Sequence, residues 1–180
     1  MTPPPGYILI RPETLVGVQK AIEAALGARA AECLAAGGRV GGAAATAALQ
    51  GDAATRARRL LSAGREIGWG DFALERLTPT ALVVSVTGSP FARAYGTAAG
   101  PVCHLTRGVL EALASVVLGR PAPITETTCA AMGADRCRFE SMDDGGDEAS
   151  PPSSPRLTRG QSTVPPSPPR LTRGQSTVRK

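Results

Sequence analysis

The sequence predicts a mixed α/β domain that is followed by a disordered tail. Apolar residues recur at helical spacing in the first third of the chain and again after position 103. Short apolar runs bounded by Gly, Pro and Thr, by contrast, are typical of β-strands. Beyond position 150 the chain is rich in Pro, Ser, Gly and Arg without apolar periodicity, so this part cannot bury enough surface to fold. We therefore predict a domain over residues 1–142 and a tail over residues 143–180.

Three helices are expected before the first strand. An Ala-rich stretch over residues 12–36 has apolar residues at helical spacing, and the pair of glycines after it is expected to end it. A short helix over 43–50 follows. A longer one over 52–67 has Asp52 as its N-cap, because an Asp side chain can accept hydrogen bonds from the first free N–H groups of a helix.

Strands are expected on both sides of a fourth helix. Residues 72–77 and 81–86 flank a Thr-Pro turn. The helix that begins at Cys103 ends at a Gly-Arg-Pro sequence. Residues 123–128 and 136–140 then form a hairpin around a Gly-Ala-Asp turn. The sequence thus places a helix N-terminus and a hairpin close together along the chain.

Four residues have the chemistry and spacing of one closed zinc site: Cys103, Glu126, Cys129 and Cys137. Zinc prefers thiolate, imidazole and carboxylate ligands in a tetrahedron, and these four would fill it without leaving a position for water. Such a metal would hold the fold together by tying the hairpin to the helix that begins at Cys103. Spacing alone leaves open the alternative of three unrelated thiols, since Cys is often a small core residue.

The segment around these thiols resembles a known family. CHLTRGVLEAL is followed by a Gly-Arg-Pro turn and by E-x-x-C-x-x-x-G-x-x-x-C-x-F, with GWG at 68–70 and SPFA at 89–92 further upstream. These features are similar to the 4-vinyl reductase domain of hydrocarbon-binding regulators, which is distantly related to the transport-particle subunits of vesicle-tethering complexes. The resemblance implies an antiparallel sheet of about four strands backed by helices. It also implies structural Zn²⁺ on the three cysteines and Glu126.

The same resemblance implies an apolar ligand between the sheet and the helices. The candidate lining residues are apolar side chains of the predicted sheet and its hairpin: Leu82, Val84, Ile124, Met132 and Phe139. A dry core built from them stays open as the alternative. Aromatic-sensing relatives recognise a phenol with a His and a Trp, whereas here the single His is His104, beside a metal ligand, and the single Trp is Trp69. We therefore expect an aliphatic ligand in preference to a phenol.

The excess of basic over acidic residues is confined to the tail. The formal net charge is +5 and the pI about 9.5, but residues 151–180 hold six basic residues and no acidic one. The first 150 residues hold 14 basic and 15 acidic residues, so the domain has no charge signature for nucleic acid. No run approaches the roughly 20 apolar residues of a membrane span. Four cysteines are too few for a disulfide scaffold, which favours the cytoplasm.

The tail contains a tandem repeat. PPSSPRLTRGQSTV at 151–164 recurs as PPSPPRLTRGQSTV at 165–178. Each copy places a Leu between two cations, which is what a short docking motif needs, and two tethered copies would give avidity for a multi-site partner. The residues predicted to contact this partner protein are Arg156, Leu157, Arg159, Arg170, Leu171 and Arg173. A duplication of low-complexity sequence without a function is the alternative.

We expect a non-enzymatic sensor or adaptor. No Ser or Cys nucleophile is paired with His104 in a recognised motif, and no glycine-rich phosphate loop follows a strand. The domain is expected to bind a small apolar ligand, to form a homodimer and to recruit a partner protein through the tail. In the alternative, the domain is a scaffold module that dimerises and pairs with proteins without any ligand.

Overall fold

A computed structural model describes residues 8–141 of the chain. The elements, in chain order, are α1 (Pro12–Leu26), a 3₁₀ turn (Gly27–Arg29), α2 (Ala30–Ala47), α3 (Ala53–Glu66), β1 (Asp71–Leu77), β2 (Leu82–Thr87), α4 (Pro90–Tyr95), α5 (His104–Leu118), β3 (Ile124–Thr128), a 3₁₀ turn (Ala130–Met132) and β4 (Cys137–Ser141). All four predicted strands and the helix after Cys103 are present. The short helix α4 was not predicted.

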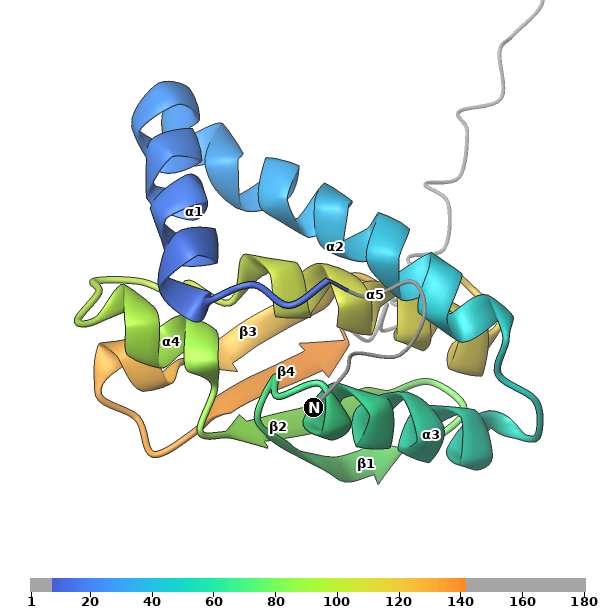
Figure 1. Cartoon of the computed structure of the whole chain (residues 1–180). Coiled ribbons are helices and arrows are strands. Elements are labelled where there is room, and N and C mark those ends of the chain that lie inside the picture. The colour runs from blue at the N-terminus through green and yellow to red at the C-terminus, as the bar shows by residue number, and fades with distance from the viewer. Residues whose placement is uncertain (1–7, 142–180) are drawn as a thin grey trace, which may run out of the picture. The chain divides into compact units, whose positions relative to one another are not determined.

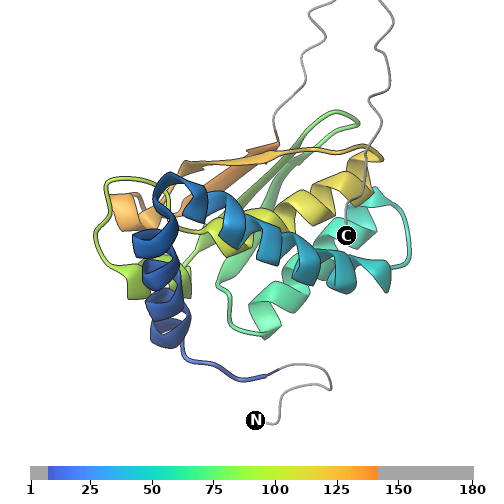
Figure 2. The same ribbon diagram turned by 90° about the horizontal axis from the view of Figure 1, so that it is seen from above.

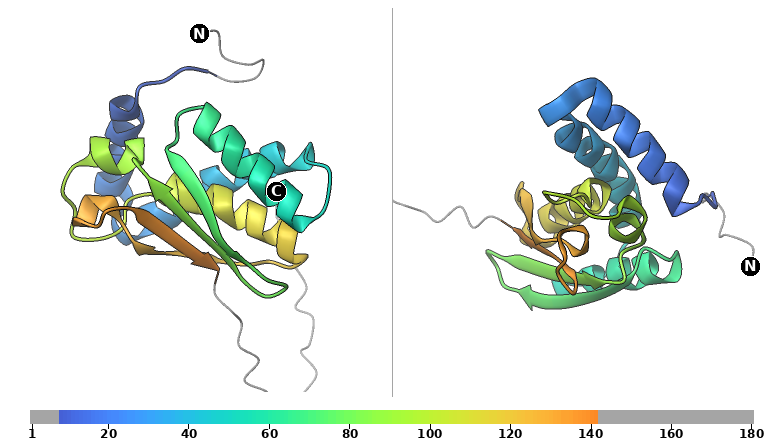
Figure 3. Two further views of the ribbon diagram at one scale, coloured as in Figure 1. Left: turned by 90° about the horizontal axis from the view of Figure 1, so that it is seen from below. Right: turned by 90° about the vertical axis from the view of Figure 1, so that its left-hand side faces the viewer.

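The strands form one antiparallel sheet in the order β1-β2-β4-β3. Helix α5 packs across β3 and β4, α3 packs on β1, and α2 lies outside α5 as a second helical layer (Figures 1 and 2). The views from below and from the side place the long helices on the same face of the sheet (Figure 3). The predicted fold class, an antiparallel sheet backed by helices, is therefore confirmed.

Helix α2 continues through the glycines that were expected to end a helix. Gly42 faces α5, and a Cβ added to it would lie 2.9 Å from the backbone oxygen of Val109. A Cβ on Gly38 would overlap the backbone of Leu105 in the same way. These glycines are needed because the backbones of α2 and α5 touch, and a helix tolerates Gly where packing compensates for its low propensity.

The prediction of separate helices over 12–36 and 43–50 was wrong for the same reason. The break occurs earlier, at Gly27, whose φ of 54° is accessible to glycine at little cost. The helix predicted over 52–67 is α3, and its expected N-cap is present: the Asp52 side chain accepts a hydrogen bond of 2.7 Å from the Thr55 N–H.

Several expectations concern residues that the structure does not describe. The boundary at residue 142 and the tandem repeat lie outside residues 8–141, as do the residues predicted to contact a partner protein: Arg156, Leu157, Arg159, Arg170, Leu171 and Arg173. Within residues 8–141, no helix is both long and apolar enough to cross a membrane.

Candidate functional site

The four predicted metal ligands meet in one buried cluster. Cys103 is the N-cap of α5, Glu126 lies in β3, Cys129 follows β3, and Cys137 begins β4. The fold brings them together because β3 and β4 are adjacent antiparallel strands and α5 begins beside them. Their Sγ and carboxylate oxygen atoms all lie within 4.8 Å of one another, and all four residues are buried.

The distances between the sulfur atoms match those around a tetrahedral ion. The Sγ atoms of Cys103 and Cys137 are 3.5 Å apart, and those of Cys137 and Cys129 are 4.0 Å apart. Ligands at the usual zinc–sulfur length of about 2.3 Å would be about 3.8 Å apart in a tetrahedron. The three cysteines are free thiols in the structure. The arrangement is therefore compatible with a metal site.

The Glu126 carboxylate offers one oxygen to the cluster without any protein partner. Its Oε2 accepts a hydrogen bond of 2.9 Å from the Cys103 N–H, whereas its Oε1 is buried and makes no hydrogen bond to the described residues. Burial raises the pKa of Glu126 to about 8. An unpaired buried carboxylate oxygen is costly, and a cation in the cluster would remove that cost.

Close packing of the three thiols also shifts their pKa values. Hydrogen bonds from Cys103 and Cys137 lower the pKa of Cys129, while hydrogen bonding and burial raise the pKa of Cys103. The Ala130 N–H donates to Cys137 Sγ at 3.4 Å, which stabilises negative charge there. A divalent ion in the cluster would favour deprotonation of every ligand. The donor set fits such an ion.

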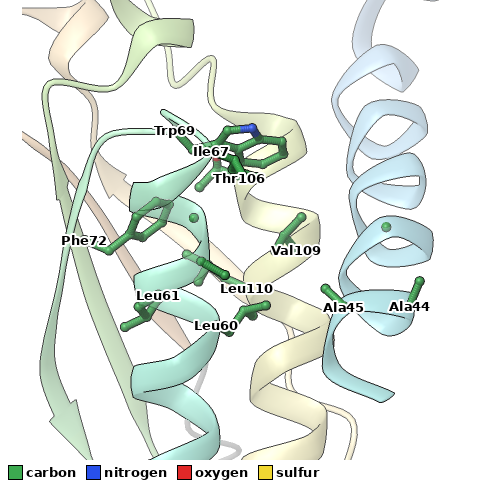
Figure 4. A pocket seen from close by; sticks show the side chains of 13 residues that line it. Ala44, Ala45, Leu60, Leu61, Ile67, Trp69, Phe72, Thr106, Val109 and Leu110 are labelled. Carbon is green, nitrogen blue, oxygen red and sulfur yellow. The ribbon is translucent and has the colours of Figure 1, made fainter. Parts of the chain in front are cut away.

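A second feature is an apolar cavity of about 410 Å³ between α2, α3, α5 and the start of β1. Its lining residues are Gly41, Ala44, Ala45, Leu60, Leu61, Ala63, Gly64, Ile67, Trp69, Phe72, Thr106, Val109 and Leu110. In Figure 4, Trp69, Ile67 and Thr106 lie together at one end, and Leu60, Leu61 and Leu110 lie at the other. Its size is in the range of cavities that hold small organic molecules.

The structure places the five residues predicted to contact a ligand away from this cavity. Leu82, Val84, Ile124 and Phe139 are almost fully buried in the hydrophobic core under α5. Met132 is 48% exposed and borders a more open hollow beside α4. None of the five lines the apolar cavity: the four sheet residues pack in the core, whereas the cavity lies between helices.

The cavity residues were missed because most of them lie on helices. Small side chains on α2, such as Ala44 and Ala45, leave room that their sequence pattern does not distinguish from ordinary helix packing. Trp69 and Phe72 were the available signal, as two of only six aromatic residues in the chain. The Trp69 ring packs edge-on against Phe91 of α4, with centroids 4.9 Å apart, and this contact fixes one end of the cavity.

Residues 82–141 match the family model of the 4-vinyl reductase domain. Over about a third of its length the chain is therefore similar to the 4-vinyl reductase family. The matched segment contains all four clustered ligands and the whole of α5, but it begins after α2 and α3, which supply most of the cavity wall. The resemblance to the 4-vinyl reductase family that the sequence motifs indicated is thereby confirmed.

Solved structures share the fold of this chain. One is described as the phenol-responsive sensory domain of the transcription activator PoxR with phenol; its TM-score is 0.66 at 17% identity, over 75% of each chain. Another is a vinyl-4-reductase family protein from Methanocaldococcus jannaschii, with a TM-score of 0.54 at 13% identity, over 77% of this chain and 84% of the other. At these identities the likeness concerns the fold. A comparison with curated proteins finds no match.

Proposed function

We propose that residues 8–141 form a small-molecule sensor domain that binds an apolar ligand in the cavity between α2, α3 and α5. The observation that carries this proposal is the cavity itself, whose wall is aliphatic or aromatic apart from Thr106 and the Trp69 ring nitrogen. A wall of this kind removes apolar ligand surface from water, which is the main driving force for binding. The structural likeness to a domain described as phenol-responsive supports it.

The domain is proposed to act by binding and to catalyse no reaction. None of the residues that line the cavity has a side chain that could act as an acid or base near neutral pH. The three thiols and Glu126 lie together in their own cluster, and none of them lines the cavity. Ligand occupancy would then act through packing, since the cavity lies between helices that must separate or close around it.

Cys103, Glu126, Cys129 and Cys137 are proposed to hold a structural zinc ion. When bound, the ion would neutralise the clustered negative charge and leave no open position for a substrate. The residues themselves join the N-terminus of α5 to both strands of the β3–β4 hairpin. Because α5 also forms one wall of the cavity, the metal would fix the position of that wall. An ion that links α5 to the hairpin in this way would have a structural role.

The repeated tail is proposed to dock a partner protein. Arg156, Leu157 and Arg159 in the first copy correspond to Arg170, Leu171 and Arg173 in the second, so a partner with two sites would be held by both.

A scaffold that dimerises without a ligand is a second candidate, and one observation favours it. Val18, on the outer face of α1, is 53% exposed, and Ile8 and Leu9, before α1, are 85% and 88% exposed. On the same helix the charged Glu23 faces inward and accepts a hydrogen bond of 2.7 Å from Tyr95 of α4. Exposed apolar residues on and just before one helix are typical of an interaction surface, and a second copy would cover them.

Native mass spectrometry of the full-length protein, purified without a chelator, separates these functions. The sensor function predicts one zinc per chain and binding of added aliphatic molecules, which Ala45→Phe should abolish by filling the cavity. Ala24→Phe, on the exposed surface of α1, is the matched control and should bind normally. A stable dimer that binds no added ligand in either form would instead support the scaffold.

A further inference from the structure

The Thr106 hydroxyl lies in the wall of the apolar cavity and forms no hydrogen bond with the described residues. The residue is only 3% exposed, and it lines the cavity from the first turn of α5. No hydrogen bond joins its hydroxyl to any other of the described residues. The oxygen is not one of the fully enclosed polar atoms that lack a partner, so it is accessible from the cavity, where water or a ligand can form a hydrogen bond with it.

The surroundings of this hydroxyl make it a distinct polar end of the cavity. Figure 4 shows Thr106 beside Trp69 and Ile67, whereas Leu60 and Leu110 lie toward the opposite end. A ligand that fills this space would therefore meet hydrogen-bonding capacity at one end and hydrocarbon along the rest. A Thr hydroxyl can both donate and accept, so it can pair with an alcohol or with a carbonyl oxygen.

The residues that line the cavity also disfavour a charged group on the buried part of a ligand. No Asp, Glu, Lys, Arg or His is among the residues that line the cavity. A carboxylate or an ammonium group buried there would lose its water without gaining a counter-charge, which is unfavourable. The cavity therefore favours uncharged molecules with one oxygen at the Thr106 end.

We propose that Thr106 is the specificity-determining residue of the cavity, and that it selects an uncharged, largely aliphatic ligand with a single hydrogen-bonding oxygen. This inference rests on the proposed sensor function, because it concerns the same cavity. It adds which class of small molecule is bound and which side chain recognises it. Such a ligand completes a hydrogen bond that the described residues do not supply to this hydroxyl.

The test is a titration of the full-length protein with three probes of equal chain length: 1-octanol, octanoate and octylammonium, at neutral pH. Trp69 is the only Trp of the chain and lines the cavity, so its fluorescence reports binding directly. Thr106→Val removes the hydroxyl at nearly constant volume, and Thr106→Ser retains it. Thr14→Val, at an exposed position of α1, is the matched control for the same chemical change elsewhere.

We expect 1-octanol to bind and the two ions to bind at least about a hundredfold more weakly, given the cost of burying an unpaired charge. Thr106→Val should weaken 1-octanol binding about two- to tenfold, the equivalent of one hydrogen bond, while Thr106→Ser and Thr14→Val should not. Thermal unfolding of each variant verifies that it is folded. If Thr106→Val unfolds, Thr106→Ala, which also removes the hydroxyl, takes its place, and the ranking of the three probes tests the selection against charge.

Two results would overturn the inference, and they differ from failure of the proposed function. If 1-octanol binds but Thr106→Val binds it equally well, Thr106 does not determine specificity. If octanoate binds as tightly as 1-octanol, the cavity does not select for neutral molecules. In both cases the sensor function survives. If no probe binds to the wild-type protein and Ala45→Phe behaves identically, the sensor function itself fails.

Discussion

The backbone N–H of Cys103 donates a hydrogen bond of 2.9 Å to Oε2 of Glu126, although the two residues are 23 positions apart. This bond joins the first residue before α5 to the middle of β3. It also leaves Oε1 of the carboxylate at the sulfur cluster without a hydrogen bond from the described residues. One carboxylate thus has a structural oxygen and a free one, which is how a metal-binding Glu is held in place.

Replacing Glu126 should therefore weaken metal binding more than it disturbs the backbone. Glu126→Gln keeps the size of the side chain but removes its charge, so we expect zinc affinity to fall at least about tenfold. Competition with a chromophoric chelator would measure it. Glu66→Gln, on the exposed end of α3, is the control and should bind zinc normally. Equal affinity in both variants would show that the carboxylate is no ligand.

The pH dependence of stability should have opposite signs with and without metal. In the metal-free fold the pKa of Glu126 is raised from 4.5 to about 8, so the folded chain binds a proton that the unfolded chain has released. Stability of the metal-free fold should then fall as the pH rises from about 4.5 to 8. Zinc requires deprotonated ligands, so the zinc-bound protein should gain stability over the same interval.

Urea unfolding at several pH values, with zinc or with a chelator present, would measure the two slopes. In the metal-free state, Glu126→Gln has no proton to release at this position and should lose most of the downward slope. Two slopes of the same sign would contradict the assignment of Glu126 to the metal cluster. A wild-type slope that Glu126→Gln leaves unchanged would show that another group titrates.

The clustering of the four side chains was predictable because Cys and Glu are recognisable metal ligands and because they lie in elements that short sequence patterns predict. Cys129 and Cys137 belong to one hairpin, and Cys103 starts a helix with a clear apolar period, so three short-range predictions sufficed to bring them together. The antiparallel sheet backed by helices came from the family resemblance and is confirmed. The order of its strands was not predicted, because local patterns alone do not fix which strands become neighbours.

The cavity and helix α2 were not predictable by the same means. Gly38 and Gly42 are indistinguishable from helix breakers until α5 is placed against them. Likewise, Leu82 and Phe139 are apolar residues of a sheet whether they border a ligand or fill a core. Both outcomes depend on how closely helices approach one another, which is a property of tertiary packing that no single segment encodes.

Two Gly→Ala changes, one where α5 contacts α2 and one on the exposed surface of α1, should have opposite effects on stability. A Cβ on Gly108 would overlap the backbone of Ala35, so Gly108→Ala should destabilise the domain by about 3 kcal/mol. Gly17, in the exposed middle of α1, has nothing within 4 Å of such a Cβ. Gly17→Ala should instead stabilise by about 0.5–1 kcal/mol, because Ala is the better helix former.

Chemical denaturation of the two glycine variants would check both signs. An unchanged midpoint for Gly108→Ala would mean that α2 and α5 lie farther apart than described. Destabilisation by Gly17→Ala would point to a tight contact at α1 that a single chain does not show, such as a second copy packed closely against this face. The pair therefore also bears on the scaffold alternative.

Loss of the buried negative charge of Glu111 should lower the free energy of unfolding of the domain. The Glu111 carboxylate is 8% exposed and lies 2.6 Å from a guanidinium nitrogen of Arg39 on α2 and 2.7 Å from one of Arg107 on α5. Removing one partner of a buried ion pair typically costs about 3–5 kcal/mol, because the remaining charges stay desolvated. Since Arg39 and Arg107 are partly exposed, water screens the remaining charges, and we expect Glu111→Gln to cost less than that range, about 2–3 kcal/mol.

The same network contains its own control. Glu32 also pairs with Arg107, at 3.1 Å, but its side chain is 63% exposed, so water screens the interaction. Glu32→Gln should change the free energy of unfolding by less than about 1 kcal/mol. Urea unfolding of both variants measures the difference. Equal losses would show that Glu111 is as accessible to water as Glu32, and that α2 is held against α5 by its glycines more than by this ion pair.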